Sequence, residues 1–182
     1  MKTTKILLLF LILVLNSCSS DNDSNTADEE VTVPTAKYAM TAKIDGVLAE
    51  MNNPFNSNFA TKPIFDYYPA TEYIQLAGRL GLDEIRLYIK RSDLKVGTYP
   101  ITFSTFNASK TQIDISYNSK GIIQYPFEGK LSITSIDLTA KVVAGTFSFN
   151  CVEDYGEPVS TSNPITTKVT EGTFNYRYDF AY

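Results

Sequence analysis

Residues 168–182, KVTEGTFNYRYDFAY, carry the clearest structural pattern of the chain. From Phe174 to Tyr182 an aromatic side chain occupies every second position, and small or polar residues lie between them. This period of two is typical of a β-strand with one buried face, because successive side chains of a strand point to opposite sides. The stretch therefore predicts a strand that turns an aromatic face toward a core.

The same alternation recurs along most of the chain from residue 38, and helical periodicity is nearly absent. Asp45-Gly46 separates two alternating runs and is the strongest hairpin signal in the sequence. Pro100 has no backbone N–H, so its run is expected to be an edge or bulged strand. The predicted strands are 38–44, 47–50, 72–80, 84–91, 98–103, 112–117, 130–138, 142–152 and 168–182.

Short turns between most of these runs predict an antiparallel all-β domain of about eight to ten strands over residues 37–182. Such a meander can fold as a two-sheet β-sandwich or as an open, lipocalin-like β-barrel. We slightly favour the sandwich, with the barrel as the alternative. Within one predicted strand, Ile74, Leu76 and Leu80 are expected to face the core.

A short pattern recurs in three of the predicted strands. Gly97-Thr98-Tyr99, Gly145-Thr146-Phe147 and Gly172-Thr173-Phe174 share the order glycine, threonine, aromatic residue. Glycine would free the backbone where a strand begins, threonine suits a pleated strand, and the aromatic side chain would be buried. We interpret the pattern as a common way of beginning a strand and not as a duplicated repeat.

The N-terminal residues have the features of a bacterial lipoprotein leader. Lys2 and Lys5 accompany a ten-residue apolar run at 6–15, which suits a signal peptide and is too short to span a bilayer. The stretch Leu15-Asn16-Ser17-Cys18 resembles a lipobox, where cleavage leaves a lipidated cysteine as the first residue. We expect a signal peptide at 1–17 and a diacylglyceryl thioether on Cys18. A further acyl chain, such as palmitate on the amine, would make a firm anchor.

Residues 18–36 are rich in Ser, Asn, Asp and Thr, and we expect them to form a disordered acidic tether. With the two leader lysines and the five tether acids set aside, residues 37–182 carry 14 basic and 15 acidic side chains. This balance gives no basic patch for nucleic acid. Acidic residues soon after the lipidated cysteine resemble the signal that exports Bacteroidota lipoproteins. The expected location is the outer membrane, facing the cell surface, with the periplasmic face as the alternative.

Several strand and turn motifs resemble an uncharacterised family of small flavobacterial lipoproteins. They comprise 40–46 (MTAKIDG), Gly97-Thr98-Tyr99, 129–150 and Gly172-Thr173-Phe174. The resemblance covers most of the chain after the tether. It implies a lipid-anchored all-β protein, and it implies no activity and no functional residues.

The two cysteines have different expected roles. Cys18 would carry lipid, so Cys151 has no partner for an intramolecular disulfide. The position of Cys151 in a predicted strand suggests a buried thiol.

The sequence contains no histidine, which excludes Ser-His-Asp and Cys-His catalysis and His-ligated zinc. Paired carboxylates could in principle hydrolyse glycosides. Asp45 and Glu50 are better explained by a hairpin, however, and the acidic residues of 153–157 by a solvated loop. Ser92-Asp93-Leu94-Lys95 matches the S-x-x-K pattern of penicillin-recognising enzymes, but it lies in a predicted turn without the accompanying motifs. We therefore expect no enzymatic activity, no cofactor and no bound metal.

The loop at 51–71 is unusually aromatic, and aromatic side chains in loops can stack on sugars or enclose apolar ligands. The favoured interpretation is that these side chains cap one end of the fold. The functional alternative is a module that binds a carbohydrate or a small apolar ligand. A structural protein that contacts other envelope proteins is the competing hypothesis. The candidate ligand-binding residues are Phe55, Phe59, Phe65, Tyr67 and Tyr68.

Overall fold

The computed structural model describes residues 38–54, 60–61, 71–102, 113–155 and 157–179. The chain divides into two compact units, Met1–Glu30 and Val31–Tyr182, and every described residue belongs to the second. The predicted signal peptide, the lipidated Cys18 and the tether at 18–36 lie outside the described residues.

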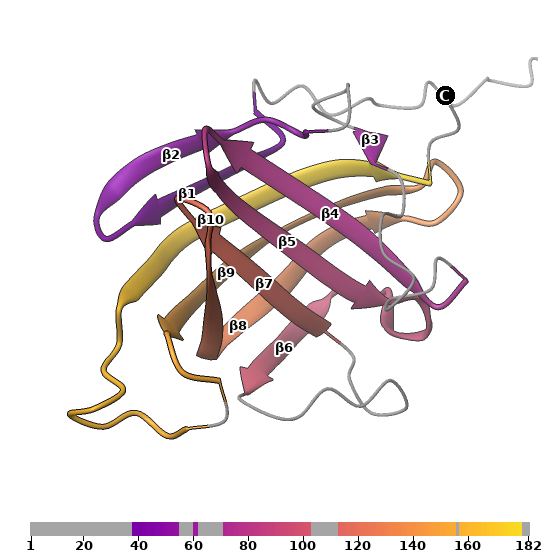
Figure 1. Ribbon diagram of the computed structural model, residues 1–182. Coiled ribbons are helices and arrows are strands. Elements are labelled where there is room, and N and C mark those ends of the chain that lie inside the picture. Colours follow the sequence, from indigo (N-terminus) through magenta and orange to yellow (C-terminus); the bar gives the residue numbers. More distant parts are fainter. Residues whose placement is uncertain (1–37, 55–59, 62–70, 103–112, 156, 180–182) are drawn as a thin grey trace, which may run out of the picture. The chain divides into compact units, whose positions relative to one another are not determined.

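The described part of the chain is all-β (Figure 1). One short 3₁₀ helix, η1 (Arg91–Asp93), follows β5. The strands are β1 (Met40–Ile44), β2 (Val47–Met51), β3 (Ala60–Thr61), β4 (Tyr73–Leu80), β5 (Asp83–Lys90), β6 (Gly97–Thr102), β7 (Ile113–Ser119), β8 (Ile122–Asp137), β9 (Val142–Val152) and β10 (Thr167–Tyr178). The predicted all-β class is confirmed.

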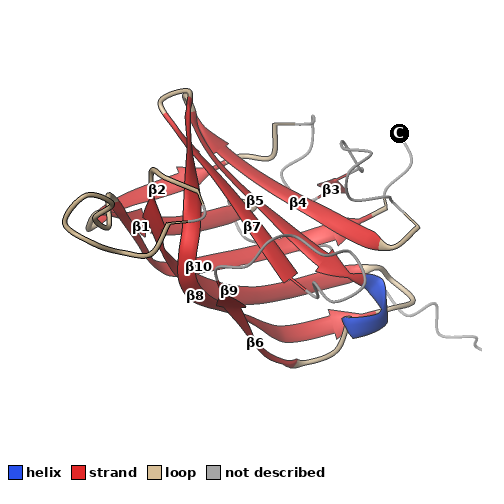
Figure 2. Ribbon diagram, turned by 60° about the horizontal axis from the view of Figure 1, so that its bottom comes forward, coloured by secondary structure: helices blue, strands red, loops and turns tan. Residues whose placement is uncertain are grey.

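The strands form a continuous antiparallel meander in the order β2-β1-β10-β9-β8-β7-β5-β4. The two ends of this path meet at Asn52 and Arg79, whose backbones exchange N–H···O bonds of 3.0 and 2.8 Å. The sheet is therefore nearly closed into a barrel, which is the architecture predicted as the alternative to the sandwich. The long strand β8 joins the two parts of the wall, because it pairs with β7 at its start and with β9 and β6 farther on (Figure 2).

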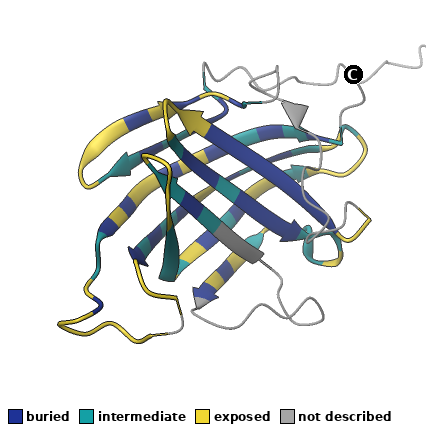
Figure 3. Ribbon diagram, in the orientation of Figure 1, coloured by how far each residue is buried: buried dark blue, intermediate teal, exposed yellow. Residues whose placement is uncertain are grey.

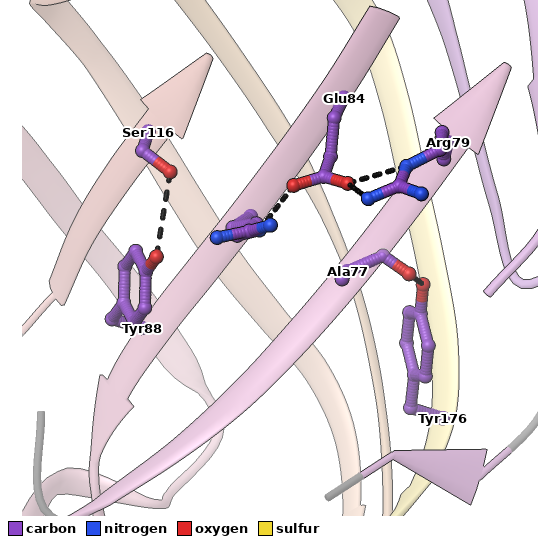
Figure 4. Close-up of polar contacts among 7 residues, drawn as sticks. Ala77, Arg79, Glu84, Tyr88, Ser116 and Tyr176 are labelled. Atoms are coloured by element: carbon purple, nitrogen blue, oxygen red, sulfur yellow. Dashed lines mark hydrogen bonds and ion pairs between the residues drawn. The ribbon is translucent and has the colours of Figure 1, made fainter. Parts of the chain in front are cut away.

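Large side chains fill the inward positions of the wall. On β10, Phe174, Tyr176 and Tyr178 are buried, as the alternation predicts, whereas Phe180 and Tyr182 lie outside the described residues. The hydroxyl of Tyr176 donates a hydrogen bond to the backbone carbonyl of Ala77 on β4, so this side chain links opposite walls (Figure 4). Burial raises the pKa of Tyr176.

Two of the three glycine-threonine-aromatic motifs pair with each other. In the antiparallel register of β9 and β10, Gly145 lies opposite Phe174, Thr146 opposite Thr173, and Phe147 opposite Gly172. A Cβ atom at either glycine would lie 2.5 Å from the facing aromatic ring. The prediction that glycine frees the backbone at a strand entry is wrong for this pair, because both glycines lie inside strands and make room for the rings.

Two other details differ from the sequence prediction. Leu80 was expected to face the core, but it is 46% exposed because the wall ends at the Gly81 turn that follows it. The beginning of β8 was not predicted, since Ile122 and Ile123 are both exposed and a register shift after Pro126 interrupts the alternation. The predicted edge position of Pro100 is confirmed, because the described part of the sheet pairs β6 with β8 alone.

Candidate functional site

A row of hydroxyl side chains crosses the outer face of five neighbouring strands. Thr41 on β1 is in register with Thr173 on β10, which faces Thr146 on β9, then Ser132 on β8 and Thr98 on β6. The hydroxyls of Thr41 and Thr173 are 2.7 Å apart, and those of Thr98 and Ser132 are 2.8 Å apart. This row results from the alternation itself, because each threonine or serine stands between two inward-facing residues.

A shallow groove of about 470 Å³ lies beside this row, over β6, β8, β9 and β10. The amide of Asn150 donates a hydrogen bond of 2.9 Å to the carboxylate of Glu128 within the groove. A carboxylate from Glu128, an ammonium group from Lys130 and the amide of Asn150 therefore occur together on one open surface. The residues that line it include Pro100, Glu128, Lys130, Ser148, Asn150 and Thr170.

A second hollow of about 330 Å³ lies on the other side of the hydroxyl row, where Ala39 and Ala144 supply small side chains. Thr134 donates a hydrogen bond of 3.2 Å to the carbonyl of Ala144 at this hollow. The side-chain oxygen of Asn175 is buried and has no hydrogen-bond partner in the described part of the chain. This oxygen is an acceptor that a hydroxylated ligand could use.

The opposite wall carries a cluster of two arginines around one carboxylate. Glu84 on β5 is 6% exposed, and its two carboxylate oxygens contact Arg79 on β4 and Arg86 on β5 (Figure 4). The Nε of Arg79 donates a hydrogen bond of 2.6 Å to Glu84. Together with Asn118, these side chains line a hollow of about 200 Å³. Sequence reasoning missed this cluster, because the only signal was Arg79 facing Glu84 across a predicted hairpin.

The predicted functional residues are outside the part of the chain that the structure describes. The loop at 51–71 leaves the wall after β2 and returns at β4, and its described residues carry none of the candidate aromatic side chains. The residues concerned are Cys18, Phe55, Phe59, Phe65, Tyr67 and Tyr68.

The structure does not bring the candidate carboxylates of Asp45 and Glu50 together. Asp45 lies in the β1–β2 turn, where its Oδ1 accepts a hydrogen bond of 2.8 Å from the backbone N–H of Lys168. Glu50 lies toward the other end of β2, opposite Thr41. Asp45 therefore stabilises the position of a turn.

The acidic loop after β9 exposes Glu153, Asp154 and Glu157, and a buried asparagine organises it. The amide of Asn163 donates hydrogen bonds to the backbone carbonyls of Asp154 and Glu157, at 3.2 and 3.0 Å. Across the described ranges, no group of three or more cysteine, aspartate or glutamate residues is arranged to hold a metal ion.

Cys151 is buried, which confirms the prediction for its thiol. Burial raises the pKa of this thiol from 9.0 to about 12, and the charge of Asp45 contributes in the same direction. A thiol that stays protonated is a poor nucleophile, so Cys151 contributes to packing.

A comparison of the chain with protein families, with curated proteins and with solved structures finds no match. Among the described residues, no helix is long and apolar enough to cross a membrane.

Proposed function

We propose that this chain is a lipid-anchored protein of the cell envelope whose β domain binds a ligand without catalysis. The support for the anchor is the sequence of the first 18 residues: two lysines, an apolar run and a lipobox-like stretch that ends at Cys18. The acidic residues of the tether favour the outer membrane and its cell-surface face. The resemblance to small flavobacterial lipoproteins agrees with this location.

The groove beside the hydroxyl row supports a carbohydrate as the ligand. Its surface offers a carboxylate, an ammonium, an amide and hydroxyls from Glu128, Lys130, Asn150 and Ser148, with Pro100 as an apolar neighbour. Sugar rings present hydroxyls that donate and accept hydrogen bonds, and they also have apolar faces, so such a mixed open surface suits them. This groove is the observation on which the proposed ligand class depends.

The interior gives less support to a small apolar ligand. Inward positions on opposite walls are occupied by large side chains such as Tyr176, Leu76 and Leu87, all with no exposed surface. The rings of Phe147 and Phe149, both buried on β9, stack with centroids 6.0 Å apart, so they also occupy space in the core. A lipocalin-like ligand would have to displace these packed groups.

Intact mass of the protein from the membrane fraction tests the anchor. We expect a mass gain equal to a diacylglyceryl group plus an acyl chain, and its loss in the Cys18→Ala variant. Protease added to whole cells should digest the domain if it faces outward. An unmodified chain in the soluble fraction would contradict the anchor.

Calorimetric titration of the mature chain, residues 18–182, with a panel of soluble oligosaccharides tests the ligand class. We expect binding that Lys130→Ala and Asn150→Ala each weaken about tenfold, since each removes a polar contact in the groove. Lys95→Ala is the matched control, because it removes an exposed lysine from the turn before β6. Equal weakening by the control, or no binding by the parent chain, would contradict the proposal.

A further inference from the structure

Three hairpin turns lie at the same end of the barrel wall. The β1–β2, β4–β5 and β7–β8 turns follow one another around the ring of strands, because the meander alternates its direction at each step. Each turn exposes two aliphatic side chains, which are between 46% and 71% exposed (Figure 3). We call these six residues the apolar rim: Val47 and Leu48, Leu80 and Leu82, and Ile122 and Ile123.

The turns that carry the apolar rim are held in place by polar contacts. The backbone N–H of Lys120 in the β7–β8 turn donates a hydrogen bond of 3.0 Å to Asp83, which follows the β4–β5 turn. The backbone N–H of Asp45 in the β1–β2 turn donates one of 2.9 Å to the carbonyl of Lys168 on β10. These hydrogen bonds fix the positions of the turns that carry the exposed aliphatic side chains.

The fourth connection at this end is the loop between β9 and β10. It exposes Tyr155 and Val159, at 53% and 40%. The ring of Tyr155 lies 5.0 Å from that of Tyr125 on β8. Apolar groups thus occur on all four connections of one end, and clustered exposed apolar groups mark contact with another apolar surface.

The hollow at the two-arginine cluster is also lined by residues of two rim turns, the β4–β5 turn and the β7–β8 turn. Gly81, Leu82 and Gly121 line the same hollow as Arg79 and Arg86. The Arg79 side chain is 47% exposed even though it contacts Glu84. A guanidinium beside exposed leucine and isoleucine side chains matches a phospholipid, whose phosphate lies directly above its acyl chains.

One buried acceptor fits the rest of a lipid head group. Asn118 is one of the residues that line this hollow, and its side-chain oxygen is buried and has no hydrogen-bond partner in the described structure. An ammonium or hydroxyl group attached to the phosphate could donate to it. The hollow therefore offers donors for a phosphate and an acceptor for the adjoining head-group donor.

The predicted tether would allow this end to reach a bilayer. The described chain begins at Tyr38, two residues before Met40, the first residue of β1, which lies at the end of β1 away from its turn. An eight-residue strand such as β5 is roughly 26 Å long. If residues 19–38 form the flexible tether that the sequence predicts, these 20 residues would span about 25 Å. A tether of this predicted length would therefore reach along a strand of the wall.

We propose that the apolar rim docks onto a phospholipid bilayer, with a lipid head group in the hollow between Arg79 and Arg86. The identification of this bilayer with the one that holds Cys18 rests on the proposed anchor. The domain would then lie with its rim on the membrane, and the described β8–β9 turn and the residues just before β6, at the opposite end, would face away from it.

Flotation with vesicles of phosphatidylcholine and phosphatidylethanolamine tests the rim without the anchor. The protein is the mature chain with Cys18→Ala, so that no lipid contributes. We expect it to float with the vesicles, and we expect Leu82→Asp with Ile122→Asp to lower the bound fraction at least tenfold. The matched control is Val96→Asp with Leu138→Asp, which are 63% and 62% exposed at the opposite end. This control should float like the parent.

A second pair of variants tests the hollow. Arg79→Gln should lower vesicle binding several-fold, whereas Lys95→Gln should leave it unchanged, because Lys95 is exposed outside the hollow. The two double variants of the flotation test and these two single variants all replace exposed side chains. Circular dichroism checks that each of the four proteins is folded.

Three outcomes would overturn the proposal. One is that the Cys18→Ala chain does not bind vesicles, and another is that rim and control variants lose binding equally. The third is self-association through the rim, seen by light scattering as a dimer that Leu82→Asp with Ile122→Asp dissociates. Intact mass reports on the anchor separately, so a failed anchor with vesicle binding and a failed rim with lipidated Cys18 are different results.

Discussion

The two halves of the sheet bury their side chains in different ways. On β9 and β10, inward residues such as Phe147 and Tyr176 are buried, while Thr146 and Thr173 between them are exposed. On β4, residues of both faces are buried from Tyr73 to Gly78, and Gln75 is only 2% exposed. The strands β9 and β10 therefore have an exposed outer face, whereas β4 is covered on both faces. Substitutions in the two halves should therefore have different costs.

The largest expected effect is in the half with one covered face. Gly172→Val should lower the free energy of unfolding by about 3 kcal/mol, because its Cβ would lie 2.5 Å from the Phe147 ring. Chemical denaturation measures this loss. Thr173→Val on the outer face is the neighbouring control, with an expected change of about 0.5 kcal/mol. Similar losses for the two variants would remove the distinction between the faces.

A smaller loss is expected where one side chain joins the two halves. Tyr176→Phe should cost about 2 kcal/mol, because the carbonyl of Ala77 would stay buried without its donor. Tyr99→Phe gives the comparison, since its hydroxyl donates to the carbonyls of Asp93 and Lys95 at the sheet edge, where water can replace it. Denaturation curves should show about half the loss for Tyr99→Phe. An equal loss would mean that the hydrogen bond between Tyr176 and Ala77 contributes no more to the free energy of unfolding than the one at the sheet edge.

In the half that is covered on both faces, the buried carboxylate of Glu84 tests the comparison. Glu84→Gln should lower the free energy of unfolding by about 1.5 kcal/mol, because two arginines lose their charged partner in a mostly covered site. Glu171→Gln on β10 is the matched control, since its pair with Lys43 at 2.8 Å is exposed and should contribute about 0.5 kcal/mol or less. A larger loss for Glu171→Gln would contradict the assignment of covered and open faces.

The smallest effect concerns the pH dependence of stability. The folded pKa of Cys151 is raised from 9.0 to about 12, so its thiol ionises more easily in the unfolded chain. The unfolded state therefore binds fewer protons above pH 9, and stability should fall by about 1 kcal/mol per pH unit from pH 9 toward pH 12. Denaturation at pH 8 to 10 measures the slope. The Cys151→Ala variant should lack the part of this slope that comes from the thiol. An identical slope for the variant and the parent would contradict the raised pKa of Cys151.

The sequence predicted best the strands that have one covered face. Phe174, Tyr176 and Tyr178 are buried as their alternation indicates, and the Asp45-Gly46 turn lies where the sequence places it. The outer burial of Tyr73 and Gln75 could not be predicted, because a strand covered on both faces loses its alternation. The sequence could not choose between sandwich and barrel, since closure depends on the pairing of Asn52 with Arg79, which has no signal in the spacing.

The candidate surfaces were harder to predict than the fold. The polar groove combines residues from four strands, and only their register brings Lys130 opposite Ser148. The apolar rim was not predicted, because the start of β8 with Ile122 was not recognised and because only the order of the strands brings the three turns to one end. The aromatic residues of 51–71 lie outside the described part of the chain, so their proposed contact with a ligand stays a prediction.

The pairing of β1 with β10 has a consequence for how the domain is made. Met40 pairs with Phe174, so the first strand of the wall, which pairs locally with β2, finds its second partner only when the last described strand has been synthesised. Pairings so distant in sequence form slowly, because a long loop must close before the contact stabilises it. Until β10 is available, β1 with its β2 hairpin would have an open edge, which is prone to pair with other chains. Release of a chain that stops before β10 should therefore lead to aggregation and not to a smaller folded domain.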